Sequence, residues 1–136
     1  MNADKALGTF TAYAVLPQLV AGDTDRAHLI FKAPRNVTIT KVECHFPIAV
    51  TGHATAFVNL NVGTVASSTS SATQVALGSI DTDTGTANNR AAGAIVDFGI
   101  TATALPEGDF LTVETEIGTT GLVLGKPSFI VTYRNT

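Results

Sequence analysis

Apolar residues recur at every second position along most of this chain, and that alternation limits how it can fold. The clearest case lies in residues 54–62, where one parity carries four aliphatic side chains: Ala56, Val58, Leu60 and Val62. Successive side chains of a β-strand point to opposite faces, so such a run buries one face of a strand. No window of eleven or more residues keeps a helical apolar stripe without Gly or Pro. We therefore predict an all-β chain.

The turn-forming residues between the alternating runs divide the chain into eight predicted strands. These are residues 7–15, 27–32, 37–46, 54–62, 73–80, 95–101, 109–117 and 128–134. One layer cannot bury all of their apolar faces, so we expect an eight-stranded antiparallel β-sandwich of jelly-roll type. Residues 1–136 form a single domain in this prediction, and residues 1–6 are a possible N-terminal arm.

The third predicted strand changes the parity of its apolar residues. Val37 and Ile39 lie on one parity, whereas Val42 and Cys44 lie on the other. One extra residue in the strand, a β-bulge near Thr40, would return all four side chains to a single face.

Two other features concern loops and turns. Residues 66–72 and 81–93 lack large apolar side chains and are predicted to be exposed loops, or loops that a partner orders. The segments 105–111, which begins Leu-Pro-Glu-Gly-Asp, and 118–121 are predicted to form hairpin turns.

Composition excludes several classes of protein. Charged residues make up 14% of the chain and the mean hydropathy is +0.28, which argues against intrinsic disorder. A net charge of −3 gives no reason to bind nucleic acid. No stretch approaches the roughly 20 apolar residues that span a bilayer, and no secretory signal is evident, so we expect synthesis in the cytoplasm and no membrane partner.

The single cysteine does not provide a catalytic nucleophile. Nucleophilic catalysis needs a base within hydrogen-bond reach of the thiol. Cys44 and His45 are neighbours in a predicted strand and should point to opposite faces. We predict a buried, inert Cys44.

Metal-binding patterns are equally weak. His45 and His53 could face one another across a turn, but no third ligand suggests itself, and His28 stands apart in sequence. Asp81 and Asp83 begin a loop that faintly resembles a calcium site, yet positions five and twelve of the calcium loop are Gly and Ala. We predict no metal and no cofactor.

Carboxylate chemistry and sugar binding find little support as well. Glu114 and Glu116 share the outward parity of their strand, which predicts a solvated face. The chain has no Trp, the residue that most often forms a platform for sugars. No catalytic residue is predicted, and an enzyme is the least favoured class.

Taken as a whole, the chain resembles the jelly-roll head decoration, or cement, proteins of tailed bacteriophages. The resemblance rests on the near absence of helix, the loops rich in Thr, Ala, Gly and Ser, the segment 105–109 and the closing strand 127–133. It implies a structural protein of the virion, a homotrimer on the capsid surface, and the major capsid protein as its partner. Many weak contacts made by one oligomer on a lattice would give tight binding.

Two alternatives stay open at this point. A phage tail, spike or fibre-head module would bind a host receptor or glycan, and a sandwich domain from elsewhere would bind a carbohydrate or other ligand. For a trimer we expect Phe57 and Ile130 at subunit contacts, because both are apolar residues on otherwise polar strand faces.

Overall fold

The computed structural model describes residues 8–18, 25–67, 74–83, 88–119 and 121–136. Within these residues the chain forms nine strands and no helix. In chain order they are β1 (Thr9–Val15), β2 (Arg26–Lys32), β3 (Val37–His45), β4 (Val58–Val65), β5 (Val75–Ile80), β6 (Ile95–Asp97), β7 (Thr103–Leu105), β8 (Phe110–Ile117) and β9 (Ser128–Asn135).

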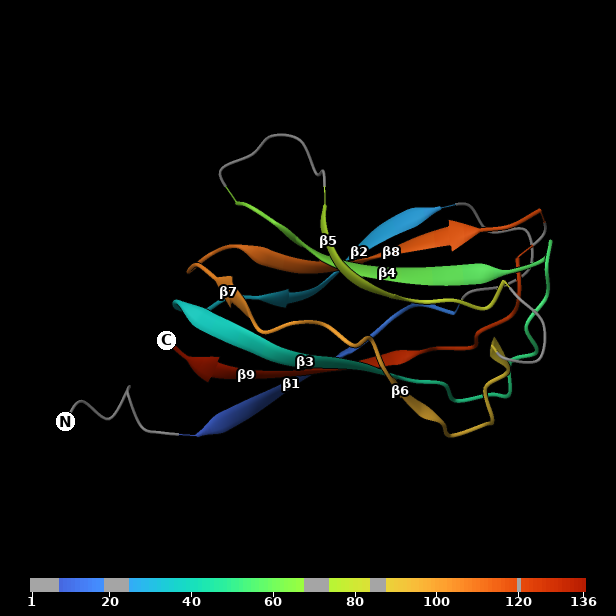
Figure 1. Ribbon diagram of the computed structural model, residues 1–136, viewed down its shortest axis with the longest axis horizontal. Coiled ribbons are helices and arrows are strands. Elements are labelled where there is room, and N and C mark those ends of the chain that lie inside the picture. Colours follow the sequence, from blue (N-terminus) through green and yellow to red (C-terminus); the bar gives the residue numbers. More distant parts are fainter. Residues whose placement is uncertain (1–7, 19–24, 68–73, 84–87, 120) are drawn as a thin grey trace.

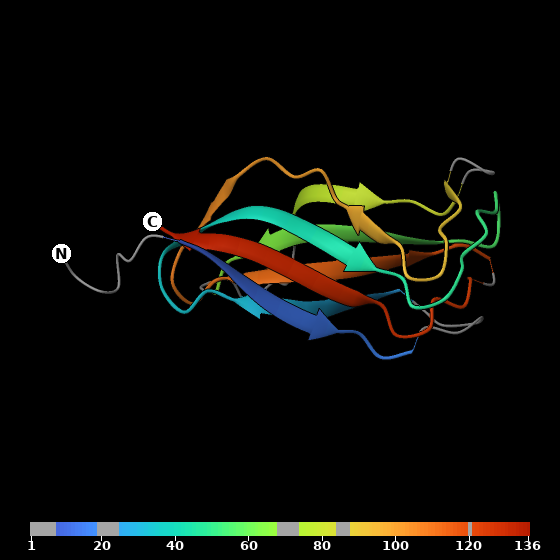
Figure 2. The same ribbon diagram turned by 90° about the horizontal axis from the view of Figure 1, so that it is seen from below.

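The strands form two sheets that lie face to face (Figures 1 and 2). The larger sheet has the order β1-β9-β3-β6, with β7 also paired to β3, and the smaller sheet has the order β2-β8-β4-β5. Every pairing between strands is antiparallel. The predicted all-β antiparallel sandwich is confirmed, whereas the predicted number of eight strands is wrong, because β7 is a further strand.

The core lies between the sheets and is built by the alternation seen in the sequence. The larger sheet contributes Ile39, Val42, Phe129 and Val131, and all four side chains are buried. The smaller sheet faces them with an equally buried set: Val58, Leu60, Val62, Leu111 and Val113. Removing these side chains from water is the main favourable contribution to folding.

The predicted β-bulge is present in β3. The register of β3 with β9 shifts between Ile39 and Lys41, so that Thr40 is the extra residue. The Thr40 hydroxyl donates a hydrogen bond to the Thr132 carbonyl oxygen at 3.2 Å. As a result the apolar residues on both sides of the bulge, from Val37 to Cys44, are buried in one core.

The predicted strand 95–101 is corrected to the shorter β6, and the further short strand β7 follows it. β6 pairs with Glu43–His45 and β7 pairs with Val37–Ile39, one on either side of the bulge in β3. Between them Gly99 has a φ of +70°, and its amide donates to the Asp97 carboxylate at 2.8 Å. This turn ends β6, because the left-handed backbone at Gly99 cannot continue a strand.

The predicted strand 54–62 is corrected to Val58–Val65. The Nδ1 atom of His53 accepts hydrogen bonds from the backbone N–H groups of Thr55 and Ala56, at 3.2 and 2.9 Å. A side chain that accepts hydrogen bonds from two successive backbone amides turns the chain around it. Residues 54–57 therefore cannot continue the extended strand.

The two predicted hairpins are turns that cross between sheets. The Asp109 amide donates to the Pro106 carbonyl oxygen at 3.0 Å, and the Gly121 amide donates to the Gly118 carbonyl oxygen at 3.1 Å, so both turns exist. However, β7 pairs with β3 while β8 pairs with β2 and β4, and β8 and β9 belong to different sheets. The hairpin prediction is therefore wrong at both positions.

The remaining segments agree with the predictions as far as they are described. Residues 66–67, 81–83 and 88–93 lie outside the strands, apart from an isolated bridge between Arg90 and Val50. The rest of the two predicted loops, 68–72 and 84–87, lies outside the described residues, as do the proposed arm 1–6 and residues 7 and 73.

A buried threonine holds the start of β4 in place. Thr82 is fully buried. Its hydroxyl accepts a hydrogen bond from the Val58 amide and donates one to the Val58 carbonyl oxygen, both at 2.9 Å. Its own amide donates to the Asn59 side-chain oxygen at 2.8 Å, and its carbonyl oxygen accepts from the His53 amide. Through its side chain and its backbone, Thr82 thus joins β4 to two connecting segments.

Replacing Thr82 tests this role. Thr82→Val keeps the shape of the side chain but leaves two buried backbone groups of Val58 without a partner, so we expect the free energy of unfolding to fall by about 1–3 kcal/mol. Urea denaturation measures the change. The exposed Thr51 provides a matched control, since Thr51→Val should change stability by less than about 0.5 kcal/mol. Equal losses in the two variants would contradict the assignment.

Candidate interaction surface

Cys44 and His45 lie on opposite sides of β3, as the alternation predicts. Cys44 is fully buried, and its sulfur contacts the His45 carbonyl oxygen at 3.9 Å. Burial removes solvent from the thiolate and raises the pKa of Cys44 to about 12. His45 is half-buried on the outer face of the larger sheet. The prediction of a buried Cys44 that does not pair with His45 is confirmed.

The burial of Cys44 predicts a thiol that does not react in the folded protein. In the folded protein at pH 8 a disulfide reagent such as DTNB should react only through unfolding, because the thiol is buried and protonated. In 8 M urea one equivalent should react at once. Ala54→Cys, at an exposed position, is the control that reports the rate of an open thiol. Equal rates for Cys44 and the control in the folded protein would contradict the structure.

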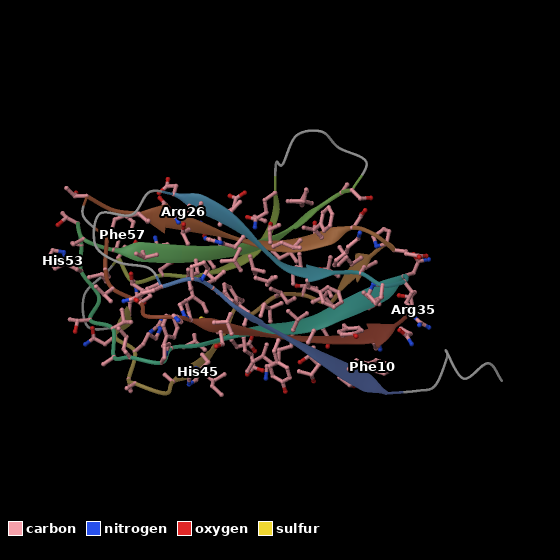
Figure 3. All side chains as sticks on the ribbon, turned by 180° about the vertical axis from the view of Figure 1, so that it is seen from behind. Phe10, Arg26, Arg35, His45, His53 and Phe57 are labelled. Atoms are coloured by element: carbon pink, nitrogen blue, oxygen red, sulfur yellow. The ribbon has the colours of Figure 1, made fainter. Side chains whose placement is uncertain are left out.

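The three histidines do not converge. His53 lies at the end of the sandwich that holds several connecting segments, whereas His45 lies on the larger sheet (Figure 3). His28 lies in β2, where partial burial, followed by the nearby charge of Arg26, lowers its pKa and favours the neutral ring. No group of three or more His, Cys, Asp or Glu side chains among the described residues could hold a metal ion.

The acidic residues flank an open depression on the outer face of the smaller sheet. The depression has a volume of about 440 Å³ and is lined by Asp25, Arg26, Ala27, Asn61, Glu114, Thr115 and Glu116. One carboxylate is already engaged, because Asp25 accepts a hydrogen bond from the Ile117 amide at 2.8 Å. Glu116 is exposed and Glu114 half-buried, so this face is polar and open to solvent.

The two aspartates of the predicted loop also make local contacts. Asp83 accepts a hydrogen bond from the Asn59 amide group at 3.4 Å. Asp81 is exposed, and its carbonyl oxygen accepts a bond from Arg90 at 3.4 Å. These contacts tie the start of this connection to β4 and to Arg90, which is a structural use of polar groups.

The outer face of the larger sheet has a different character near β1. Tyr13 and Val15 are 73% and 63% exposed. The register places Tyr13 beside Ile130 of β9, and Val15 beside Ser128. We call Tyr13, Val15 and Ile130 the β1 patch. Three neighbouring apolar side chains that face solvent on a rigid sheet are typical of a surface that binds another protein.

Beyond the β1 patch the same face becomes polar. Ile130 lies beside Glu43 of β3, and the Glu43 carboxylate forms an ion pair with Lys41 at 3.3 Å. The exposed Ile95 of β6 lies next to His45 at the other edge of the sheet. Paired charges in the middle of the face thus separate the β1 patch from Ile95 at the other edge.

The two predicted contact residues lie on different surfaces. Ile130 is half-buried at the centre of the β1 patch. Phe57 is half-buried just before β4, where its ring lies against Gly118: a Cβ atom at Gly118 would be 2.6 Å from the ring. In Figure 3 Phe57 lies near His53, at the end of the sandwich. The structure therefore does not bring Phe57 and Ile130 together.

Sequence reasoning missed Tyr13 and Val15. The available signal was that residues 9–15 carry apolar side chains on both parities: Phe10, Ala12 and Ala14 on the one that packs inward, Tyr13 and Val15 on the other. A strand with apolar residues on both faces leaves one apolar face outside the core, which indicates a contact surface.

Comparison of the chain with models of protein families, with curated proteins and with solved structures finds no match in any of the three. Among the described residues, no helix is long and apolar enough to cross a membrane.

Proposed function

We propose that this chain is a bacteriophage head decoration protein that binds the lattice of the major capsid protein, on the virion surface, as a homotrimer. The observation that carries the proposal is the β1 patch, where Tyr13 and Val15 are largely exposed on the flat face of a sheet. Flat surfaces with apolar residues bind other proteins, whereas small substrates bind in concave, well-enclosed sites.

The order of the strands supports the jelly-roll topology that belongs to this proposal. If β6 and β7 are counted as one interrupted strand, the sheets have four strand positions each, β1-β9-β3-β6/β7 and β2-β8-β4-β5. Consecutive strands then change sheet at every step except from β4 to β5. Jelly rolls consist of eight strands in two such sheets and are common in viral capsid domains.

The chemistry of the exposed strands suits a protein bound at many sites. The chain has 21 threonines, and several lie on exposed strand positions beside the β1 patch, such as Thr9 and Thr11. Short hydroxyl side chains lose little conformational freedom on contact. Weak contacts repeated by the chains of one oligomer add up to tight binding on a lattice.

Binding to heads tests the proposal. Purified protein should add to undecorated heads of the phage that encodes it, saturate at a fixed number of chains per capsid subunit, and raise the temperature at which the heads break. Tyr13→Ser should weaken this binding about tenfold or more, as expected for a central aromatic contact. Leu29→Ser, at a similarly exposed position of the smaller sheet, is the matched control.

The location on the particle separates the alternatives. Antibody labelling of intact particles should mark the head. Labelling of the tail, spike or fibre would overturn the capsid proposal in favour of a receptor-binding or glycan-binding module. Failure to bind heads in the previous experiment would also overturn it.

The trimer and its predicted contacts need a separate test. Phe57→Asp and Ile130→Asp should each lower the mass of the assembly in solution while the thermal unfolding of the monomer stays close to that of the parent chain. Thr132→Asp, on the same face of β9 as Ile130, and Ala54→Asp, near Phe57, are the matched controls. A large loss of thermal stability would instead place Phe57 or Ile130 in the core.

A further inference from the structure

β1 lies at an edge of the larger sheet (Figure 2), and among the described residues only β9 pairs with it. The Leu16 amide donates to the Pro127 carbonyl oxygen at 2.9 Å, in register with the pairing of Val15 and Ser128. In an antiparallel pair, alternate residues bond to the neighbouring strand. The odd-numbered residues of β1, from Thr9 to Val15, therefore direct their N–H and C=O groups away from β9.

The other sheet edges carry features that discourage pairing with another chain. β2 has Arg26 and Lys32 near its ends and a bulge between Leu29 and Phe31. The edge beyond β3 consists of two three-residue strands. β5 is approached by residues 98–100, since a Cβ atom at Gly78 would lie 2.7 Å from the Phe98 carbonyl oxygen. Charges, bulges, short strands and covering segments are the usual protections of edges.

Among the described residues, β1 carries no charge, bulge or interruption that would protect its edge. Its seven residues, TFTAYAV, include no charged residue, proline or glycine, and its register with β9 is free of shifts. Tyr13 and Val15 are exposed beside the open edge. An unprotected, regular and partly apolar edge is a template for another strand.

We propose that β1 pairs with β1 of a second copy of this chain, antiparallel and about a two-fold axis at Ala12, which joins two larger sheets into one. The side chains of β1 argue for this partner. In a register centred on Ala12, each large side chain meets a small one of the other copy: Tyr13 opposite Thr11, Val15 opposite Thr9, and Phe10 opposite Ala14. Two copies of β1 are therefore complementary in shape to one another, which favours a second copy of this chain as the partner.

The backbone groups fit the same register. The pairs Thr11–Tyr13 and Thr9–Val15 join odd-numbered residues, whose free N–H and C=O groups then face each other, so the two strands form up to about eight hydrogen bonds. Because no residue of β1 is charged, two identical strands meet without repulsion. The two Tyr13 rings lie diagonally across the axis, within reach of one another.

This pairing does not rest on the proposed function. A two-fold contact cannot close a three-fold ring, so it is a second contact beside any that forms the predicted trimer. It requires an even number of chains: a dimer of about 28 kDa, twice the 14.0 kDa of one chain, or a larger even assembly.

Native mass spectrometry and sedimentation of the purified chain measure this number. Thr11→Pro removes a backbone N–H that points outward and leaves the bonds to β9 intact, and Tyr13→Lys places like charges near the axis. Each variant should weaken the pairing about tenfold or more while its thermal unfolding shows a folded monomer. Leu29→Lys, the same kind of change on the edge strand β2, should leave the mass unchanged.

A cross-linking experiment tests the register. Ala12 is the position that meets itself, and a pair of this kind, without hydrogen bonds between its residues, has Cα atoms about 4.5 Å apart, within the range of a disulfide. Ala12→Cys should therefore form a cross-linked dimer under mild oxidation. Ala14→Cys, on the same face of the same strand, should not, because it meets Phe10.

The outcomes that overturn the pairing are distinct from failure to bind phage heads, which overturns the proposed function. A monomer at all concentrations would overturn the predicted trimer together with the pairing. An odd assembly such as a trimer, or an even assembly unchanged by Thr11→Pro and Tyr13→Lys, would also overturn the pairing. Cross-linking of Ala14→Cys as efficiently as Ala12→Cys would overturn the register and with it the two-fold axis at Ala12. None of these results bears on whether the chain binds phage heads.

Discussion

The bulge at Thr40 is the constraint on which much of this sandwich depends. β3 lies between β9 on one side and β6 and β7 on the other, so its side chains must supply the middle of one core face. Without the extra residue, either Val37 and Ile39 or Val42 and Cys44 would point to solvent. With it, all four are buried, and the neighbouring edge is divided into two short strands on either side of the irregularity.

The two outer faces of the sandwich differ in a way that bears on function. The smaller sheet presents carboxylates around an open depression, whereas the larger sheet presents apolar side chains beside its β1 edge. The polar side chains of the connections, such as Thr82 and His53, are used to hold backbone turns. Exposed apolar side chains also occur singly on other strands, such as Leu29 and Val75, whereas Tyr13 and Val15 lie together beside the unpaired edge of β1.

The sequence predicted the elements whose information is local. Strand type follows from side-chain alternation, the bulge follows from a change of parity, and the burial of Cys44 follows from its neighbours in one strand. The predictions that were wrong needed information from elsewhere in the chain. The start of β4 depends on two hydrogen bonds to His53, and β7 exists because it meets the far side of β3. The turns at 106–109 and 118–121 were recognised, but the strands that each one joins belong to different sheets.

By itself, the sequence determined that this chain is an antiparallel β-sandwich with one continuous core, because alternation along each strand decides which side chains can be buried together. It also indicated that Cys44 and His45 cannot act together, because adjacent strand residues face opposite ways. Only the tertiary structure decided which strands lie at the edges. Pairing depends on contacts between residues far apart in the chain, and it is this order that leaves β1 open, with Tyr13 and Val15 at its side.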